Sequence, residues 1–171
     1  MQAKQNDAAA TPRLGRYRID TGASAVEFGS RHLFGLMPVH GTFKVRSGTV
    51  DIAEPLTDSK IQVDIDAASF HTGDERRDKD VRSAHFLDSA GYPVMAFVSA
   101  SADATGVTGT LTVCGITRPV ALSIQDSEVT PDSFTVRATT RIDRIEFGVT
   151  RARGMAGRHL DLTLKIKCVR V

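Results

Sequence analysis

Residues 160–168 read Leu-Asp-Leu-Thr-Leu-Lys-Ile-Lys-Cys, so apolar and polar side chains alternate at every step. Successive side chains of a β-strand point to opposite faces of the sheet, and a strict period of two over nine residues therefore predicts a half-buried strand. The same alternation occurs at 61–66 and 120–125. Weaker alternation predicts further strands at about 17–20, 24–32, 38–52, 94–101, 107–114 and 134–143.

The composition agrees with a strand-rich chain. Val, Ile and Thr supply 42 residues against only 10 Leu, and β-branched side chains fit a pleated sheet better than a helix. Turn-forming sequences separate the predicted strands, among them Asp-Thr-Gly at 20–22 and Thr-Pro-Asp-Ser at 130–133. Eight or nine short strands at this spacing indicate an antiparallel sandwich or barrel.

One segment interrupts the strand pattern. Residues 72–75 read Thr-Gly-Asp-Glu, which has the spacing of a capping box, with a hydroxyl first and a carboxylate three residues later. We expect a short, mostly solvated helix over 74–84, extended by a further turn to about residue 88. Because no longer amphipathic helix is available to cover a sheet, the sheet must cover itself. The sequence thus predicts an all-β fold with one short helical segment at about 74–88.

The chain has 171 residues, 41% of them hydrophobic and 25% charged, and its length favours one domain. Residues 1–16 are polar and Ala-rich without periodicity, which predicts a flexible N-terminal tail before a folded domain at 17–171. The longest apolar run, 94–98, is far too short for a transmembrane helix. No stretch of 1–16 could form a signal-peptide core, so we expect a cytoplasmic protein. The net charge of +2 gives no argument for a nucleic-acid partner.

The sequence offers no local catalytic or metal-binding motif. Its five histidines form no His-x-x-x-His pair, and neither a Gly-x-Ser-x-Gly motif nor a phosphate-binding glycine loop occurs. Cys114 and Cys168 are interpreted as small buried hydrophobes. We therefore predict no catalytic residue, no metal and no cofactor. Two alternatives stay open: an enzyme that uses His32, His71 and His85 on a lipophilic substrate, and a packed barrel that serves as a stress or interaction module.

Eight phenylalanines and no tryptophan are available for the interior. Phe28, Phe43 and Phe97 lie in predicted strands, and Phe34, Phe70, Phe86 and Phe147 lie beside turns. Aromatic side chains at strand ends line a cavity mouth in one interpretation and plug the barrel in the other, and the residues alone leave both open. The segment 151–158 carries three arginines, which either contact a polar or acidic group or are simply solvated.

Ordered motifs along 17–170 resemble one known family. They read Arg-Ile-Asp at 18–20, Val-Glu-Phe at 26–28, His-Leu at 32–33, Gly-Thr-Phe at 41–43, Ala-Ser-Phe-His-Thr-Gly at 68–73, Arg-Asp-Lys-Asp-Val-Arg-Ser at 77–83, His-Phe-Leu-Asp at 85–88, Tyr-Pro-Val-Met-Ala-Phe at 92–97, Gly-Thr-Leu-Thr-Val-Cys-Gly-Ile-Thr-Arg-Pro-Val at 109–120 and Arg-Ile-Glu-Phe-Gly at 144–148. In this order they are similar to the motifs of the YceI-like proteins, and the resemblance covers essentially the whole predicted domain.

The resemblance implies a lipocalin-like antiparallel eight-stranded β-barrel, often dimeric, with an elongated apolar tunnel and no catalytic centre. It implies binding, sequestration or transport of a long lipophilic ligand such as a polyisoprenoid, an isoprenoid quinone or a similar amphiphile. We expect a homodimer whose tunnel is lined by Phe28, His32, Leu33, Phe43, Phe70, Phe86, Met95, Phe97, Ile142 and Phe147. Arg31, His32 and the arginines of 151–158 are candidates for contact with a polar head group.

Overall fold

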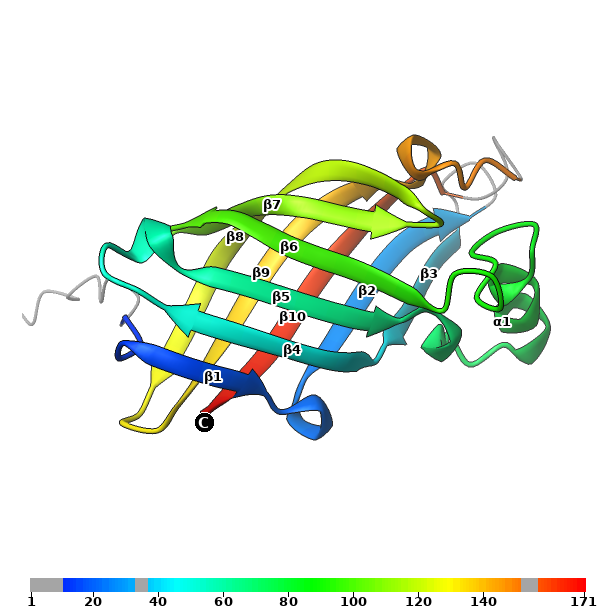
Figure 1. The fold of residues 1–171 in the computed structure, drawn as a ribbon. Helices are drawn as coiled ribbons and strands as arrows, with labels where there is room; N and C mark the ends of the chain where they lie inside the picture. Colours follow the sequence, from blue (N-terminus) through cyan, green and yellow to red (C-terminus); the bar gives the residue numbers. More distant parts are fainter. Residues whose placement is uncertain (1–10, 33–36, 152–156) are drawn as a thin grey trace, which may run out of the picture.

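Ten β-strands and one short α-helix make up the part of the chain that the computed structural model describes, residues 11–32, 37–151 and 157–171 (Figure 1). The strands are β1 (Gly15–Ile19), β2 (Ala25–His32), β3 (Met37–Phe43), β4 (Val45–Ile52), β5 (Lys60–Asp66), β6 (Val94–Ala102), β7 (Gly106–Val113), β8 (Ile116–Val129), β9 (Ser133–Asp143) and β10 (His159–Arg170). The helix is α1 (Glu75–Arg82), and short 3-10 helices are η1 (Thr21–Ala23), η2 (Leu56–Asp58), η3 (Ala67–Ser69) and η4 (Arg144–Phe147).

The strands form one antiparallel sheet that closes on itself. Its order is β1-β4-β5-β6-β7-β8-β9-β10, and pairing of β1 with β10 completes a ring of eight strands. The hairpin of β2 and β3 is added to this ring through β2, which also pairs with β10. The predicted all-β antiparallel barrel with one short helix is therefore confirmed.

Strand β10 closes the barrel, because both of its edges are paired. One of its edges pairs with β9 from His159 to Val169. Its other edge pairs first with β2, through residues 161–165, and then with β1, through residues 168–170. Strands β1 and β2 therefore follow one another along a single edge, and the barrel is longer than either of them.

The single strand predicted at 38–52 is two strands, β3 and β4, separated at Lys44. The Lys44 backbone N–H donates to the Ser69 hydroxyl oxygen at 2.7 Å, and its carbonyl accepts the N–H of Asp66 at 3.0 Å. These contacts with η3 and its N-cap residue take Lys44 out of the strand ladder, so the chain changes partner there. Strand β3 pairs with β2, whereas β4 pairs with β1 and β5.

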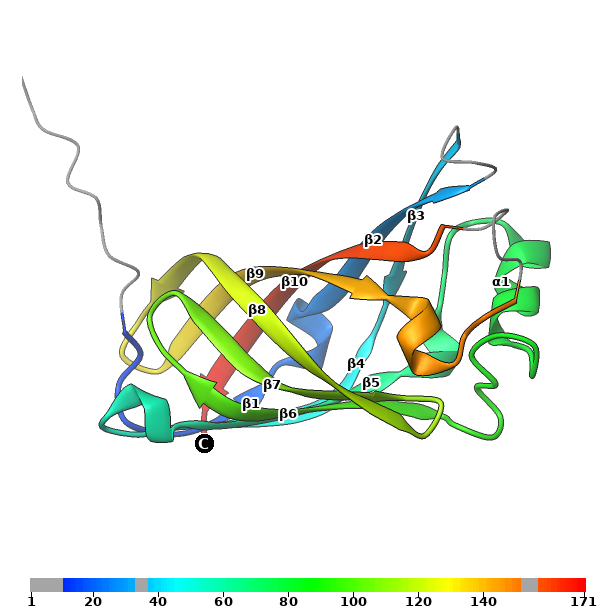
Figure 2. The same cartoon turned by 90° about the horizontal axis from the view of Figure 1, so that it is seen from above.

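Helix α1 begins at Glu75, and its N-cap is Asp74 rather than the Thr72 that the capping-box spacing predicted. The Asp74 carboxylate accepts the backbone N–H of Arg77 at 3.0 Å. The Thr72 hydroxyl instead donates to the Asp78 carboxylate at 2.5 Å, so it is not free to cap the helix. The helix lies at one end of the barrel, and residues 11–14 lie at the opposite end (Figure 2).

The folded part of the chain begins before the predicted boundary at residue 17. Gly15 and Arg16 belong to β1, and the residues before them contact the barrel. The Tyr17 hydroxyl donates to the carbonyl of Arg13, and the Arg170 side chain donates to the carbonyl of Leu14, both at 2.8 Å. Residues 1–10 of the predicted tail lie outside the described residues.

The alternation of β10 separates a wet outer face from a dry inner one, as the sequence predicted. On the outer face, Asp161 pairs with Arg141 at 3.0 Å, and Lys165 pairs with Glu27 at 3.2 Å. The inner face carries Leu160, Leu162, Leu164, Ile166 and Cys168, which pack with the core. The inward faces of the other strands are also apolar, so the period-two pattern accounts for an apolar interior along the whole barrel.

Candidate functional site

The barrel interior holds two chambers that meet along its axis. The helix-end chamber, beside α1, has a volume of about 190 Å³ and is lined by residues that include Val81 and Phe86. The far chamber, toward the N-terminal residues, has a volume of about 180 Å³, and its wall includes Pro12 and Phe134. Five apolar side chains line both chambers and form their junction: Val26, Ile65, Leu111, Ile142 and Leu162. The chambers are thus adjacent along the barrel and share part of their apolar wall.

Alternate residues of β10 trace this cavity from end to end. Leu160 lines only the helix-end chamber, Leu162 lines both, and Leu164, Ile166 and Cys168 line the far chamber. Eight residues of strand span about 27 Å, which a strand tilt near 40° converts into roughly 20 Å along the barrel axis. The cavity is therefore elongated, with a shape suited to a chain rather than to a compact molecule.

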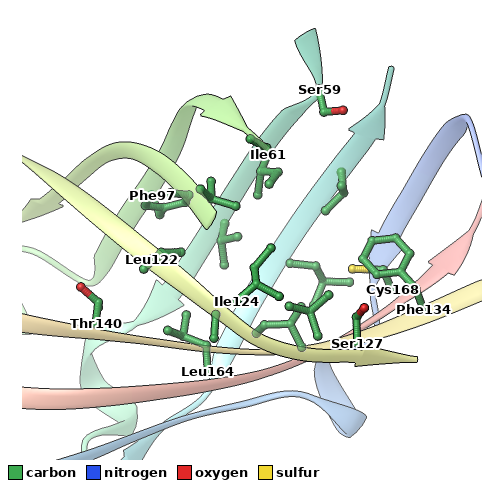
Figure 3. Close-up of a pocket in the computed structure, with 18 of the residues that line it drawn as sticks. Ser59, Ile61, Phe97, Leu122, Ile124, Ser127, Phe134, Thr140, Leu164 and Cys168 are labelled. Carbon is green, nitrogen blue, oxygen red and sulfur yellow. The ribbon is translucent and has the colours of Figure 1, made fainter. Parts of the chain in front are cut away.

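The far chamber has an aliphatic wall. Ile61, Ile124 and Leu164 belong to β5, β8 and β10, and they line the chamber together with Phe97 and Phe134 (Figure 3). An apolar cavity of about 150 Å³ stays dry in water and takes up an apolar guest. A chamber of this size and lining therefore favours hydrocarbon over water.

Aromatic side chains line the helix-end chamber. Phe28 and Phe70 are stacked with ring centroids 5.1 Å apart, and Phe43 lies 5.5 Å from each of them. Phe28 comes from β2 and Phe43 from β3, while Phe70 follows η3 and connects the barrel to α1. The three rings are buried and also line the chamber, so they fix its shape through mutual packing.

Three charged residues contribute to the otherwise apolar walls of the two chambers. In the helix-end chamber, Arg144 is only 8% exposed. Its Nε donates to the carbonyl of Gly157 at 2.8 Å, and its Nη1 donates to the carbonyls of Val149 at 2.6 Å and Arg151 at 2.9 Å. These bonds tie η4 to the segments on either side of residues 152–156. Arg77 of α1 lines the same chamber.

The wall of the far chamber includes one acidic residue, which is itself exposed to solvent. Asp103, in the turn between β6 and β7, lies in its wall. The Thr105 hydroxyl, the Thr105 backbone N–H and the Gly106 backbone N–H all donate to this carboxylate, and together they hold the pKa of Asp103 below its usual range. Asp103 is therefore ionised at neutral pH.

The structure describes the side chains of eight of the ten residues predicted to line the tunnel, and it places all eight in the cavity wall. Those in the helix-end chamber are Phe28, Phe43, Phe70, Phe86, Met95, Ile142 and Phe147, and Phe97 lies in the far chamber. Leu33 and the side chain of His32 lie outside the described residues. Contact of these residues with a ligand stays a prediction.

The candidates for head-group contact are separated from the cavity where the structure describes them. Arg158 pairs with Asp143 at 2.8 Å, and Arg151 contacts His85 at 3.0 Å. Neither arginine lines either chamber. Arg153 and the side chain of Arg31 lie outside the described residues.

Most of the far chamber was absent from the predicted site. Its wall is formed by the inward members of the alternating strands, such as Ile61, Val63, Leu122, Leu164 and Ile166. The signal was present, because the period-two pattern already assigned these side chains to the inner face. The prediction weighted aromatic residues, whereas the chamber is built mainly from aliphatic ones.

The two described histidines of the alternative enzyme hypothesis lie outside the cavity wall. His71 has a side chain 68% exposed, with its Nδ1 3.6 Å from the Asp78 carboxylate, and His85 contacts Arg151. Neither imidazole lines either chamber. Across the three described ranges, no cluster of three or more His, Cys, Asp or Glu side chains is arranged to hold a metal ion.

We expect Cys168 to resist thiol reagents in the native protein. Its side chain is 1% exposed, and burial raises the pKa of the thiol to about 12, so almost no thiolate exists at pH 8. Titration with Ellman's reagent should modify no more than Cys114 before unfolding. Both cysteines should react in guanidinium chloride, and rapid modification of two thiols in the native protein would contradict this placement.

A family model described as the YceI-like domain matches residues 17–168. The chain belongs to the YceI-like family. A UPF0312 protein of Pseudomonas putida (strain GB-1) is 36% identical over 168 residues, which cover 90% of this chain and 86% of that protein. Protein YceI of Escherichia coli O17:K52:H18 (strain UMN026 / ExPEC) is 34% identical over 166 residues, again covering 90% and 86%.

The fold is also shared with a solved structure. A polyisoprenoid-binding domain from Saccharophagus degradans superposes with a TM-score of 0.73 at 16% identity, over 93% of this chain and 100% of that domain. The YceI-like match at 17–168 contains every residue of both chamber walls except Thr11 and Pro12. The cavity is therefore a feature of the YceI-like domain itself. No helix in the described ranges has both the length and the apolar character needed to cross a membrane.

Proposed function

We propose that this YceI-like protein binds a long lipophilic ligand, without catalysis, in the cavity along its barrel axis. The observation that carries the proposal is the pair of adjacent apolar chambers that share five lining residues inside the barrel. The solved relative of the same fold from S. degradans is a polyisoprenoid-binding domain, which supports a polyisoprenoid, an isoprenoid quinone or a similar amphiphile as the ligand. Binding alone, without catalysis, is sufficient for sequestration or transport of such a molecule.

The hydrocarbon chain supplies most of the affinity in this proposal. Removing one CH₂ group from water contributes about 0.8 kcal/mol, so a few such groups outweigh a single polar contact. An elongated cavity of roughly 20 Å, built from strands of about 3.4 Å per residue, accepts additional chain length until the far chamber is full. The barrel therefore selects ligands by length as well as by polarity.

We expect the affinity to rise with ligand length and then to level off. Isoprenoid alcohols of increasing length should bind progressively more tightly, because each added unit buries more apolar surface. Native mass spectrometry and the shift of melting temperature measure this series on the purified protein. Failure of every member to bind, with no lipid retained during purification, would contradict the proposed function.

The enzyme alternative is not adopted. Its described imidazoles, His71 and His85, lie outside both chamber walls, so they are not placed to act on a molecule in the cavity. The packed-barrel alternative is disfavoured by the two chambers themselves. The homodimer and the cytoplasmic location stay predictions.

A further inference from the structure

A segment that precedes the barrel forms part of the far-chamber wall. Thr11 and Pro12 line this chamber, although they lie before β1. Connections between strands supply other parts of the same wall, such as Leu56 of η2 and Ala104 in the turn between β6 and β7. Residues 11–14 lie at the end of the barrel opposite α1 (Figure 2). They therefore cover part of the far end of the cavity, and we call them the N-terminal strap.

The N-terminal strap is attached through side chains, whereas backbone ladders join the strands. The Tyr17 hydroxyl donates to the carbonyl of Arg13, and Nη2 of Arg170 donates to the carbonyl of Leu14, both at 2.8 Å. Nη1 of Arg170 also donates to the Tyr17 hydroxyl oxygen at 3.3 Å. Within the described ranges, no hydrogen bond between backbone groups joins residues 11–14 to the barrel. The strap can therefore detach without opening the sheet.

The two anchoring side chains differ in burial. Tyr17 is fully buried, and its ring packs edge-to-face on Phe134 with the ring centroids 4.8 Å apart. Phe134 itself lines the far chamber. Arg170 lies over the Tyr17 ring, with Cζ 5.7 Å from its centroid, but is exposed to solvent. Tyr17 thus connects the strap to the wall of the chamber, and Arg170 is the anchor that exchanges readily with water.

Gly15 sets the direction in which the strap leaves β1. Its φ of +133° lies in a region that residues with a side chain rarely adopt. A Cβ atom at this position would also lie only 3.0 Å from Nη2 of Arg170. Glycine therefore permits the turn toward the far end of the barrel and leaves room for the guanidinium that holds Leu14.

We infer that the N-terminal strap is a closure of the far chamber, and that a ligand tail filling this chamber holds the strap in its attached position. The inference rests on the proposed function and adds an element that closes on the ligand, with Gly15 and Arg170 as the residues that position it. A tail in contact with Pro12 removes further apolar surface from water. That contact exists only while the strap is attached, so ligand binding and strap attachment strengthen each other by the same factor.

Tryptic cleavage after Arg13 reports detachment of the strap, because a protease cuts a segment once it is locally released. Mass spectrometry follows this cut in the full-length protein, in Arg170→Gln and in Arg18→Gln. Arg18 is an exposed residue of β1 that lines neither chamber, so its substitution removes the same charge without touching the strap. We expect Arg170→Gln to be cut about three- to tenfold faster than the wild-type protein, as loss of one hydrogen bond allows. Arg18→Gln should be cut at the wild-type rate.

A bound ligand should have the opposite effect on the same cut. Saturation with geranylgeraniol, a long isoprenoid alcohol, should slow cleavage after Arg13 about threefold or more in the wild-type protein. The factor equals the gain in affinity that the attached strap gives to this ligand. Trypsin activity on a short peptide substrate, measured at the same geranylgeraniol concentration, controls for inhibition of the protease.

A second variant protects the conclusion against a folding defect in Arg170→Gln. Gly15→Ala strains the backbone and crowds the guanidinium, so it should also speed the cut after Arg13. The double variant should exceed the faster single variant only slightly, because both changes loosen one contact.

Three results would overturn the inference and leave the proposed function intact. They are equal cleavage of Arg170→Gln and Arg18→Gln, a cut that bound geranylgeraniol leaves unchanged, and a cut that bound geranylgeraniol accelerates because its tail displaces the strap. Failure of geranylgeraniol to bind the wild-type protein, as measured by native mass spectrometry, would count against the proposed function as well.

Discussion

Replacing Leu162 with tryptophan is expected to abolish the gain in affinity that long ligands obtain over short ones. Leu162 lines both chambers, so a larger side chain at this position fills the junction between them. A ligand tail would then occupy one chamber only. An isoprene unit that is kept out of the other chamber leaves about four CH₂ equivalents in water. The binding free energy then becomes weaker by about 3 kcal/mol per unit, which is more than a hundredfold in affinity.

The control for this substitution lies on the outer face of the barrel. Val98 of β6 is 48% exposed and lines neither chamber, so Val98→Trp adds the same ring without narrowing the cavity. The natural chain has no tryptophan, so each variant carries a single indole whose fluorescence reports its surroundings. Emission from Trp at 162 should be blue-shifted relative to that at 98. Unchanged dependence on ligand length in Leu162→Trp would show that the chambers are not used as one cavity.

Replacing Arg144 with methionine is expected to destabilise the protein by about 3 kcal/mol. The substitution leaves the buried carbonyl of Val149 without this donor and removes the bonds to Gly157 and Arg151. Buried acceptors that lose a donor cost about 1–3 kcal/mol each. For a domain of this size, the melting temperature should fall by roughly 6–12 °C.

Arg141→Met is the matched control for this second substitution. Arg141 pairs with Asp161 on the outer face, with a side chain 66% exposed, and exposed ion pairs contribute about 0–1 kcal/mol. Thermal unfolding followed by circular dichroism should therefore separate the two variants clearly. Similar melting temperatures for both would mean that Arg144 does not hold η4 in place.

The alternation at 160–168 was sufficient to predict both the strand and its inward face, because a period of two depends only on neighbouring residues. The break at Lys44 could not be predicted in this way. It depends on the Ser69 hydroxyl and on Asp66, which come from a different part of the chain. Local pattern therefore predicted the strands, and contacts distant in sequence decided where one of them divides.

The candidate site shows the same difference between what local pattern predicts and what distant contacts decide. Seven phenylalanine and methionine positions were identified through aromatic content and family resemblance, and the structure places them in the cavity wall. Arg77 lies in the segment 74–84, which the sequence predicted to be a mostly solvated helix. Its place in the cavity wall depends on how α1 sits on the barrel, which the composition of the helix does not reveal.

The seam between β1 and β10 has a consequence for how the chain acquires its structure. It pairs Tyr17 with Arg170, so the ring closes only when segments 153 residues apart in sequence meet. Contacts of such separation form slowly, because the entropy of a long loop is lost before they contribute. On the ribosome, β1 can pair with β4 early, but its second partner, β10, exists only when nearly the whole chain has been synthesised. Until then, the apolar lining of the future cavity is open to solvent and prone to aggregation. Addition of the last strand, β10, closes the barrel and buries this lining.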